Sequence, residues 1–421
     1  MQRLKIEGSK KLCGEIEIQG AKNSALPILS ACVLTRDEVS LKRCPPLSDV
    51  YAATRILSAL GCKCKRNGDS LVIDSSSIDG AEISDELMRR MRSSIIFLGA
   101  LLGRLGECTL SFPGGCELGP RPIDLHLSAL RQLGAQIEEE HGSLICRCPK
   151  GLRGTLVNLS FPSVGATENI MLAACTAKGE TIISNAAREP EICDLANFLT
   201  ECGARIKGAG TQRIVIEGVN AGSLHGCEYT VMPDRIAAVT YLSAAAITDG
   251  EVFIKGANGT DLEAVINVFK QAGCSVYEYG EGIYLNSSDK GLKSVGMVRT
   301  QPYPGFPTDA QAIVMACLTK ARGTTIFVED IFENRFRHVD ELVRMGANIT
   351  TEGRVAVVSG VRRLSSAAVF APDLRGGAAL CVAACAAQGE TVISNVELID
   401  RGYDSIENAL AKLGAKANRI K

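Results

Sequence analysis

The chain repeats one pattern of hydrophobic and polar positions six times. In each copy a polar pair leads into a short apolar strand, and an amphipathic helix follows the strand. The six polar pairs are Asp37-Glu38, Gly106-Glu107, Gly179-Glu180, Gly250-Glu251, Gly323-Thr324 and Gly389-Glu390. The helices end on the signatures Leu60-Gly61-Cys62, Leu133-Gly134-Ala135, Cys202-Gly203-Ala204, Ala272-Gly273-Cys274, Met345-Gly346-Ala347 and Leu413-Gly414-Ala415. The period of roughly 70 residues is longer than that of solenoid repeats and fits a small βαβ-type unit.

A second, more apolar helix precedes each of these strands. Its residues are rich in Ala and Leu on all sides, which predicts burial on every face. The six apolar helices are expected at 23–34, 91–105, 166–177, 235–248, 310–319 and 377–387. Two further strands are expected after each Gly-containing signature, for example Arg213–Glu217 and residues 227–231.

The sixth repeat lacks this pair of strands, and the N-terminus supplies a similar one. Arg3-Leu4-Lys5-Ile6-Glu7-Gly8 resembles Arg213-Ile214-Val215-Ile216-Glu217-Gly218, so residues 1–20 are expected to complete the last repeat. This arrangement predicts two domains of three repeats, one formed by residues 21–229 and the other by 1–20 plus 230–421. Each domain is expected to pack three sheets around its buried helices. The chain crossings near 20 and 230 would act as a hinge beside a cleft that holds the active site.

Length and charge agree with two domains and exclude some partners. A chain of 421 residues is too long for one ordinary core. There are 46 Lys and Arg residues and 47 Asp and Glu residues, which gives a net charge of -1. This balance does not indicate binding to nucleic acid or to an anionic membrane. The longest apolar stretch, at 95–102, is too short to span a bilayer, and the first residues are charged rather than leader-like. A cytoplasmic protein is therefore expected.

The 17 cysteines predict neither disulfides nor a metal site. There is no Cys-x-x-Cys pattern, and none of the four His is paired at ligand spacing. Many cysteines lie in apolar stretches, where a free thiol behaves as a small hydrophobic group. These are Cys32, Cys175, Cys317, Cys381 and Cys385.

Charged and polar residues gather at the starts of the apolar helices and in the turns before the second helices. They include Lys22, Asn23, Arg92, Thr167, Glu168, Asp234, Arg235, Asp309, Asp373 and Arg375, with Arg188, Glu189, Asn334, Arg335, Asp400 and Arg401 in the turns. Helix N-termini favour anions, and Arg can bind phosphate and carboxylate groups bidentately. We expect a shared anion site. The alternative is that the Asp and Asn residues are ordinary N-caps and the Arg residues lie on the surface.

Two irregular segments hold candidates for the chemistry. The Gly- and Pro-rich loop 112–122 presents Cys116, and the neighbouring Arg121 would favour its thiolate. An inert loop cysteine is the alternative. Asp309 follows a Pro-flanked turn at 304–308 and is a candidate general base, provided that it does more than cap a helix beginning at Ala310.

Motifs along the whole chain resemble those of the UDP-N-acetylglucosamine 1-carboxyvinyltransferase family of enolpyruvyl transferases. They are Gly20-Ala21-Lys22-Asn23-Ser24-Ala25-Leu26-Pro27, Pro113-Gly114-Gly115-Cys116, Gly119-Pro120-Arg121-Pro122-Ile123-Asp124-Leu125-His126, Ser163-Val164-Gly165-Ala166-Thr167-Glu168-Asn169, Arg188-Glu189-Pro190-Glu191, Pro233-Asp234-Arg235, Phe306-Pro307-Thr308-Asp309, Phe332-Glu333-Asn334-Arg335-Phe336 and Asp400-Arg401-Gly402-Tyr403.

The resemblance implies a fold and an activity. The fold is a two-domain inside-out α/β barrel, or prism, in which each domain holds three βαβαββ units. The implied reaction transfers the enolpyruvyl group of phosphoenolpyruvate to the 3′-hydroxyl of UDP-N-acetylglucosamine and releases phosphate, the first committed step of peptidoglycan synthesis. It implies no cofactor, no metal and no obligate protein partner.

The resemblance also implies a role for each matched residue. Lys22, Asn23, Arg121 and Arg401 would hold phosphoenolpyruvate. UDP-N-acetylglucosamine would contact Arg92, Arg121, Pro122, Ile123, Asp124, Leu125, Ser163, Val164, Gly165, Asp309 and the backbone at Ile331. Cys116 would donate a proton to the methylene carbon and form covalent adducts with phosphoenolpyruvate and fosfomycin, and Asp309 would accept the proton of the sugar hydroxyl. Glu189, Asp234, Arg335, Asp373 and Arg375 would support these groups.

Two alternatives stay open. The sister enzyme that acts on shikimate 3-phosphate shares the fold and chemistry, but it does not use the Pro-Gly-Gly-Cys loop. A catalytically inactive sensor of UDP-sugars is the second alternative. Retention of Lys22, Cys116, Arg121, Asp309 and Arg401 together argues against it.

Overall fold

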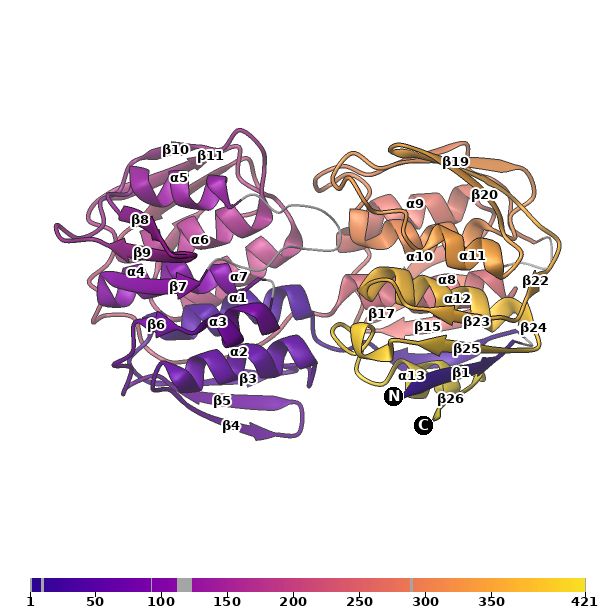
Figure 1. Cartoon of the computed structure of the whole chain (residues 1–421), viewed down its shortest axis with the longest axis horizontal. Helices are drawn as coiled ribbons and strands as arrows, with labels where there is room; N and C mark the ends of the chain where they lie inside the picture. Colours follow the sequence, from indigo (N-terminus) through magenta and orange to yellow (C-terminus); the bar gives the residue numbers. More distant parts are fainter. Residues whose placement is uncertain (1, 9–10, 92, 112–122, 288–290, 421) are drawn as a thin grey trace. The chain divides into compact units, whose positions relative to one another are not determined.

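A computed structural model describes residues 2–8, 11–91, 93–111, 123–287 and 291–420. The chain divides into two compact units, labelled by element in Figure 1. The N-terminal unit holds the described residues of 20–232, and the C-terminal unit holds those of 1–19 and 233–421. No helix in the described part of the chain is long and apolar enough to cross a membrane.

Three four-stranded sheets form the N-terminal unit. The first has the order β14 (Glu228–Thr230), β3 (Glu38–Lys42), β5 (Ser70–Asp74), β4 (Lys63–Asn67). The second has the order β6 (Glu82–Ile83), β7 (Glu107–Ser111), β9 (Ser143–Arg147), β8 (Gln136–Glu140). The third has the order β10 (Leu156–Asn158), β11 (Glu180–Ser184), β13 (Arg213–Glu217), β12 (Arg205–Lys207).

The C-terminal unit repeats this plan. Its sheets have the orders β16 (Ser275–Tyr279), β17 (Gly282–Asn286), β15 (Glu251–Lys255), β2 (Cys13–Glu17), then β18 (Met297–Arg299), β19 (Thr324–Val328), β21 (Val355–Ser359), β20 (Asn348–Glu352). The third is β23 (Ala368–Phe370), β25 (Glu390–Ser394), β1 (Arg3–Glu7), β26 (Lys416–Ile420), and β22 (Leu364–Ser365) pairs with β24 (Ala387–Gln388). All six strands expected after the polar pairs are present.

Each repeat passes its last strand to the sheet of the next repeat. In the N-terminal unit β14 leaves the third repeat and pairs in parallel with β3 of the first, with Glu228 opposite Ser40, so the three sheets close into a ring. The N-terminal strands follow the same rule. β1 pairs with β25 and β26 and completes the sixth repeat, as expected. β2 is the strand that the sixth repeat passes on, and it pairs in parallel with β15 of the fourth repeat, where Ile16 lies opposite Ile254.

Helices are distributed in the same way in both units. The N-terminal unit contains α1 (Lys22–Ala31), η1 (Cys32–Leu34), α2 (Ser48–Ala59), α3 (Asp85–Arg90), η2 (Ser94–Ile96), α4 (Phe97–Leu105), α5 (Asp124–Gln132), α6 (Val164–Ala174) and α7 (Pro190–Glu201). The C-terminal unit contains α8 (Arg235–Ile247), η3 (Thr260–Leu262), α9 (Glu263–Gln271), α10 (Thr308–Leu318), α11 (Val339–Arg344), α12 (Leu374–Ala386), η4 (Val396–Leu398) and α13 (Ile406–Lys412).

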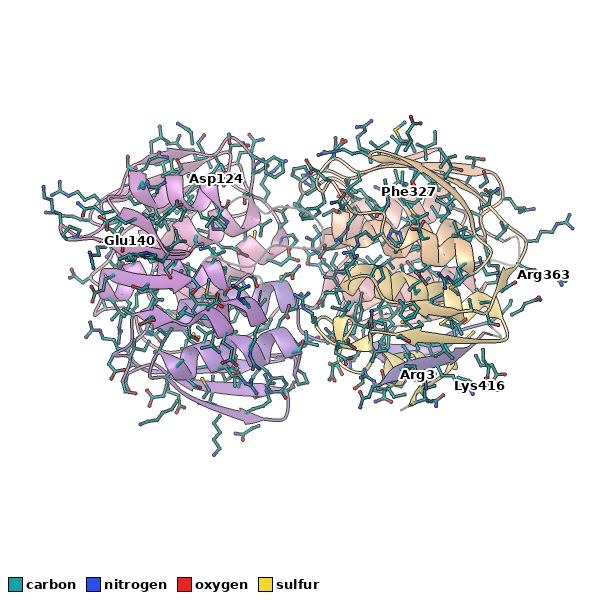
Figure 2. All side chains as sticks on the ribbon, viewed as in Figure 1. Arg3, Asp124, Glu140, Phe327, Arg363 and Lys416 are labelled. Carbon is teal, nitrogen blue, oxygen red and sulfur yellow. The ribbon has the colours of Figure 1, made fainter. Side chains whose placement is uncertain are left out.

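The apolar helices form the centre of each unit. Every residue of α8 is buried, and α8, α10 and α12 pack on one another inside the ring of sheets (Figure 1). Their composition explains this position, since small Ala and Gly side chains let three helices approach closely without leaving a polar face. Charged side chains such as Arg3, Glu140, Arg363 and Lys416 project outward, whereas Phe327 lies in the interior (Figure 2).

The Gly-containing signatures end six helices in one way. The central glycines all have positive φ: 100° at Gly61, 103° at Gly134, 99° at Gly203, 96° at Gly273, 88° at Gly346 and 95° at Gly414. A residue with a Cβ atom is strained in this region, and a left-handed residue after a helix lets the chain turn back into a strand. This requirement explains why the signature recurs.

The 16 described cysteines are free thiols. The five expected in apolar surroundings, Cys32, Cys175, Cys317, Cys381 and Cys385, are at most 1% exposed. Burial raises the pKa of Cys175 and of Cys385 to about 12, so both stay protonated at neutral pH. Among the described residues no group of three or more His, Cys, Asp or Glu side chains is arranged to hold a metal ion.

Candidate active site

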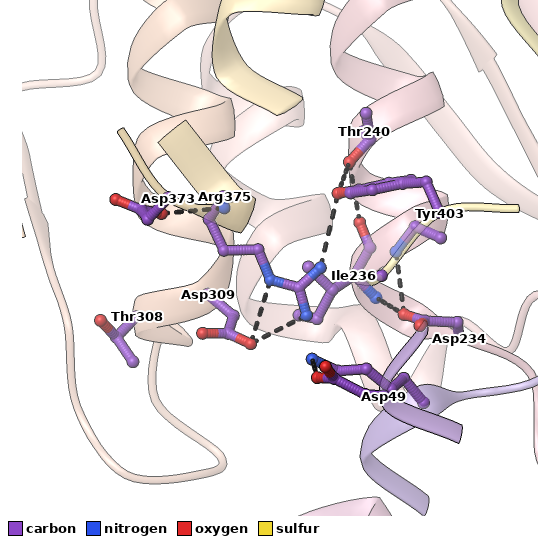
Figure 3. A network of polar contacts seen from close by, with 12 residues as sticks. Asp49, Asp234, Ile236, Thr240, Thr308, Asp309, Asp373, Arg375 and Tyr403 are labelled. Carbon is purple, nitrogen blue, oxygen red and sulfur yellow. Dashed lines mark hydrogen bonds and ion pairs between the residues drawn. The ribbon is translucent and has the colours of Figure 1, made fainter. Parts of the chain in front are cut away.

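Asp309 lies in the first turn of α10 and binds two arginines, of which Figure 3 shows Arg375. The helix begins at Thr308 with Pro307 as its N-cap residue, so the interpretation of Asp309 as the cap of a helix starting at Ala310 was wrong. Asp309 Oδ1 accepts a hydrogen bond from Arg335 Nη2 at 2.9 Å, and Oδ2 accepts one from Arg375 Nη2 at 2.9 Å and one from Nε at 3.2 Å.

The two arginines are more deeply buried than the carboxylate they hold. The side chains of Arg335 and Arg375 are 3% and 4% exposed, and that of Asp309 is 30% exposed. Burial opposes the charge of Arg375, but the Asp309 carboxylate raises the pKa of this guanidinium above its ordinary value. Arg375 therefore stays charged, and Asp309 remains within reach of a solute.

Asp234 and Asp373 are N-caps, as the plainer interpretation of the sequence proposed. Asp234 accepts hydrogen bonds from the backbone N–H groups of Ile236 and Ala237, both at 2.9 Å. Asp373 accepts them from the N–H groups of Arg375 at 2.9 Å and Gly376 at 3.0 Å. The cap at Asp373 starts α12 at Leu374, earlier than the expected start at 377, and fixes the direction in which Arg375 leaves the helix.

The segment that carries Arg401 is tied to the same network through Tyr403. Tyr403 is 1% exposed, and its hydroxyl lies 2.7 Å from the Thr240 hydroxyl. Arg375 Nη1 donates to the Tyr403 hydroxyl at 3.5 Å, at the long end of hydrogen bonding. Burial raises the pKa of Tyr403, so its hydroxyl stays protonated and can donate to Thr240.

The backbone N–H of Ile331 is engaged within its own unit. Glu329 is 1% exposed and accepts hydrogen bonds from the N–H groups of Ile331 and Phe332, both at 2.9 Å. Its second oxygen accepts the Thr308 hydroxyl at 3.0 Å. Glu329 thus joins the turn after β19 to the start of α10, and the sequence patterns did not single it out.

In the N-terminal unit Lys22 is the first residue of α1 and is buried against Asp49. Lys22 Nζ lies 3.1 Å from Asp49 Oδ2, and the two side chains are 10% and 4% exposed. Asn23, the next residue, is exposed. No motif marks Asp49 in the sequence. An acidic residue in the first turn of a helix is common, because it interacts favourably with the helix dipole.

Asp194 on α7 fixes the start of α1. The Ser24 hydroxyl and the Tyr229 hydroxyl both donate to Asp194, the second at 2.6 Å, and the N–H of Met232 donates at 3.2 Å. Burial raises the pKa of Asp194, although these donors act in the opposite direction. One carboxylate therefore anchors both α1 and the chain just before the crossing at 232–233.

The starts of α5 and α6 lie together, which brings two of the expected nucleotide segments side by side. A Cβ atom on Gly165 would lie 3.0 Å from the ring of His126, so glycine permits this contact. Asn169 Nδ2 lies 2.7 Å from His126 Nδ1. Ser163 caps α6, Val164 and Gly165 are half-buried, and Ile123, Asp124 and Leu125 form the start of α5. Burial lowers the pKa of His126 to about 4, so the ring is neutral at neutral pH.

Acidic side chains gather near the starts of α6 and α7. Glu168 is 6% exposed, and burial, followed by the nearby Glu191 and Glu189, raises the pKa of its carboxyl well above the ordinary value. Glu189 is the N-cap residue of α7 and is half-buried. Arg92, Cys116, Arg121 and Pro122 lie outside the described residues, so their expected roles stay predictions.

Comparison with known proteins defines the class. The family model described as EPSP synthase (3-phosphoshikimate 1-carboxyvinyltransferase) matches residues 6–410. The chain belongs to this family of carboxyvinyl transferases, as the motifs led us to expect.

Particular relatives are more specific than the family model. A protein of Caldanaerobacter subterraneus subsp. tengcongensis named UDP-N-acetylglucosamine 1-carboxyvinyltransferase 2 is 51% identical over 420 residues, which is 100% of both chains. A UDP-N-acetylglucosamine 1-carboxyvinyltransferase of Nitratidesulfovibrio vulgaris is 47% identical over 419 residues, covering 100% of this chain and 99% of the relative.

Two solved structures share the fold. The enolpyruvyl transferase NikO from Streptomyces tendae has a TM-score of 0.89 at 24% identity, covering 99% of this chain and 98% of its own. EPSP synthase from Acinetobacter baumannii has a TM-score of 0.75 at 19% identity over 100% of both chains. The expected two-domain α/β fold is confirmed.

Proposed function

We propose that this protein transfers the enolpyruvyl group of phosphoenolpyruvate to the 3′-hydroxyl of UDP-N-acetylglucosamine, releasing phosphate, in peptidoglycan synthesis. The observation that carries the proposal is identity of 51% and 47%, over essentially the whole chain, to relatives with that named activity. The proposal includes small-molecule substrates only and a cytoplasmic location.

The reaction is an addition followed by an elimination. The methylene carbon of phosphoenolpyruvate gains a proton while the sugar oxygen bonds to C2, which gives a tetrahedral ketal. The methyl carbon then loses a proton, the C2–O bond to phosphate breaks, and the enol ether remains. Negative charge builds on the phosphate as the C2–O bond breaks, and pre-oriented cations stabilise it.

The proposed binding of phosphoenolpyruvate uses three cations. Lys22, with Asn23, Arg121 and Arg401, is assigned to the phosphate. The geometry of Lys22 supports this role, because a buried ammonium group paired with one carboxylate, Asp49, has a fixed position and loses little entropy on binding. Asn23 is exposed beside it and can donate from its amide.

Asp309 is assigned as the base toward the 3′-hydroxyl. Its carboxylate is held at both oxygens by buried arginines yet is 30% exposed, so it is pre-oriented and reachable. Arg335 and Arg375 would stabilise the negative charge nearby, and Asp373 orients Arg375 through its cap. Cys116 is assigned as the proton donor at the methylene carbon and as the residue that fosfomycin labels.

The proposed UDP-N-acetylglucosamine site uses the adjoining starts of α5 and α6. Ile123, Asp124 and Leu125 would contact the nucleoside end, together with Arg92, Arg121 and Pro122. Val164 and Gly165 begin an eleven-residue helix that Ser163 caps, and the positive end of such a helix suits a diphosphate. The backbone of Ile331 would meet the sugar through its carbonyl, because its N–H already donates to Glu329.

Shikimate 3-phosphate is the second candidate acceptor, because the matching family model is described by that substrate. Phosphate release from phosphoenolpyruvate should be measured with each acceptor. We expect turnover with UDP-N-acetylglucosamine and none above background with shikimate 3-phosphate. The reverse pattern would overturn the assignment, and no turnover with either acceptor in a folded sample would favour a sensor of UDP-sugars.

A further inference from the structure

One glutamine side chain holds the backbone of the segment that carries Arg401. Gln19 Nε2 donates to the carbonyl oxygen of Gly402 at 3.0 Å, and the N–H of Asp404 donates to Gln19 Oε1 at 3.0 Å. The two partners are a carbonyl and an N–H, so only one orientation of the amide satisfies both. The hydrogen bonds fall on either side of Tyr403.

The other end of the segment is held by an ion-pair cluster. Arg419 Nη1 donates to Asp400 Oδ2 at 2.8 Å, and Arg419 Nε donates to Glu407 Oε1 at 2.7 Å. Asp400 precedes Arg401 directly. Arg401 thus extends from a short backbone segment fixed at Asp400 by Arg419 and at Gly402 and Asp404 by Gln19.

The same segment reaches the Asp309 network. Tyr403 lies between the two backbone groups that Gln19 binds, and its hydroxyl contacts Thr240 and Arg375 (Figure 3). Arg375 in turn holds Asp309. A displacement of the backbone at 402–404 would therefore move Arg401 and would also alter the contact between Tyr403 and Arg375.

Gln19 is itself fixed at the point where the chain leaves the C-terminal unit. The unit boundary falls after residue 19, and the carbonyl oxygen of Gln19 accepts the N–H of Asp234 at 2.9 Å. Asp234 also caps α8 through its side chain. The side-chain amide of Gln19 therefore extends from a backbone that is hydrogen-bonded to a helix terminus. This restricts the positions that the amide can adopt.

We infer that Gln19 is a positioning residue for Arg401 and through it sets the affinity for phosphoenolpyruvate. The inference rests on the proposed function, in which Arg401 binds the phosphate of this substrate. Gln19 carries no charge, so it acts on the position of the guanidinium and not on the field at the site. A guanidinium that binds phosphate bidentately depends strongly on its orientation.

Gln19→Met tests the inference, because methionine has a similar length and cannot form either hydrogen bond. We expect KM for phosphoenolpyruvate to rise roughly tenfold, the effect of losing two ordinary hydrogen bonds. KM for UDP-N-acetylglucosamine should stay within about twofold, and kcat should change less than KM for phosphoenolpyruvate, because Asp309 keeps its contacts with Arg335 and Arg375. Gln388→Met, at an exposed glutamine on β24 of the same unit, is the matched control and should change neither KM. Gln19→Glu keeps the acceptor for Asp404 but turns a carboxylate toward the Gly402 carbonyl, so an equal or larger rise is expected.

A double-mutant cycle separates positioning from a general loss of structure. If Gln19 acts through Arg401, Gln19→Met should add almost nothing in an Arg401→Ala background. Equal effects of Gln19→Met in both backgrounds, or an unchanged KM for phosphoenolpyruvate in the single variants, would overturn the inference.

Hydrogen exchange supplies a readout that does not depend on turnover. The Asp404 N–H should exchange faster in Gln19→Met than in wild type and should stay protected in Gln19→Glu. If wild-type protein shows no turnover while this exchange pattern is observed, the proposed function is wrong, but the hydrogen bond between Gln19 and Asp404 is supported. If wild type is active and Gln19→Met and Gln19→Glu behave as wild type in KM and in exchange, the positioning role fails alone.

Discussion

The two units share one architecture but place opposite charges at the start of one central helix each, α1 in the N-terminal unit and α10 in the C-terminal unit. In the N-terminal unit Lys22 begins α1 and is buried against one carboxylate, Asp49. In the C-terminal unit Asp309 lies in the first turn of α10 and is held by two buried arginines. Both residues stand at the start of a central helix, and we propose that the residue placed there decides whether the position binds an anion or accepts a proton.

The difference also separates the proposed tasks. A cation paired with a carboxylate can still attract a phosphate group, which suits phosphoenolpyruvate. A carboxylate fixed by two guanidinium groups is oriented for a hydroxyl and cannot rotate freely, which suits the acceptor sugar. Changes in the two units should therefore affect different substrates.

The largest effect is expected from Asp309→Asn. If Asp309 is the base, kcat should fall by roughly 10²–10⁴, while calorimetry should still detect binding of UDP-N-acetylglucosamine. The amide leaves Arg335 and Arg375 without their carboxylate, so the melting temperature should also fall. A normal kcat would remove Asp309 from the chemistry.

Asp49→Asn tests the cation of the N-terminal unit. Lys22 would then be buried without its carboxylate, and the free energy of unfolding should fall by about 3–5 kcal/mol, the usual cost of breaking a buried pair. KM for phosphoenolpyruvate should rise more than KM for UDP-N-acetylglucosamine. Denaturant titration and steady-state kinetics measure the two effects. Asp85→Asn, in an exposed pair with Arg89, is a suitable control, and an equal loss of stability there would contradict the account.

One buried histidine in each unit should make stability depend on pH. Burial lowers the pKa of His126 and of His338 to about 4, below the value of about 6.5 in an unfolded chain. The unfolded state binds more protons between these values, so stability is complete above about pH 6.5 and is lost as pH falls toward 4. Each histidine should contribute a loss of about 2 kcal/mol between pH 7 and pH 5.

The histidine prediction is tested with His126→Gln and His338→Gln, each of which should flatten part of the pH profile of the unfolding free energy. His225→Gln, at an exposed site, should leave the profile as it is. An unaltered slope in both buried variants would show that other groups cause the pH dependence.

The smallest effect is expected at Glu168 in the N-terminal unit, where other acidic side chains lie near its carboxyl group. Its pKa is raised by burial and by Glu191 and Glu189. The folded state therefore holds this proton to a higher pH than the unfolded state, and stability falls as pH rises through the raised value. Glu168→Gln should increase the melting temperature at pH 8 but have little effect at pH 4. An increase of the same size at both values would point to packing instead of charge.

Much of the architecture could be predicted from residues that are constrained locally. The six glycines at positive φ and the apolar helices were recognisable, because backbone conformation and burial restrict the residue types at these positions. The pairing of β2 with β15 of the fourth repeat could not be predicted. The two strands are far apart in sequence, and β2 alone fits either sheet.

The site was predicted less completely for a related reason. Lys22, Asp309, Arg335 and Arg375 stand in motifs, but their partners do not. Asp49, Asp194 and Glu329 look like ordinary helix or turn residues, and only tertiary contacts show that they hold Lys22, the start of α1 and the turn at Ile331. Asp234 and Asp373 also stand in motifs, and their side chains cap helices.

The central claim is enolpyruvyl transfer with cleavage of the C2–O bond, and an isotope label tests it directly. Phosphoenolpyruvate carrying ¹⁸O in the oxygen that bridges C2 and phosphorus would be converted with UDP-N-acetylglucosamine, and both products would be analysed by mass spectrometry. The account predicts that the label leaves with phosphate and that the sugar gains an unlabelled enolpyruvyl ether at its 3′-oxygen. Label retained in the organic product, with phosphate derived from P–O cleavage, would contradict it.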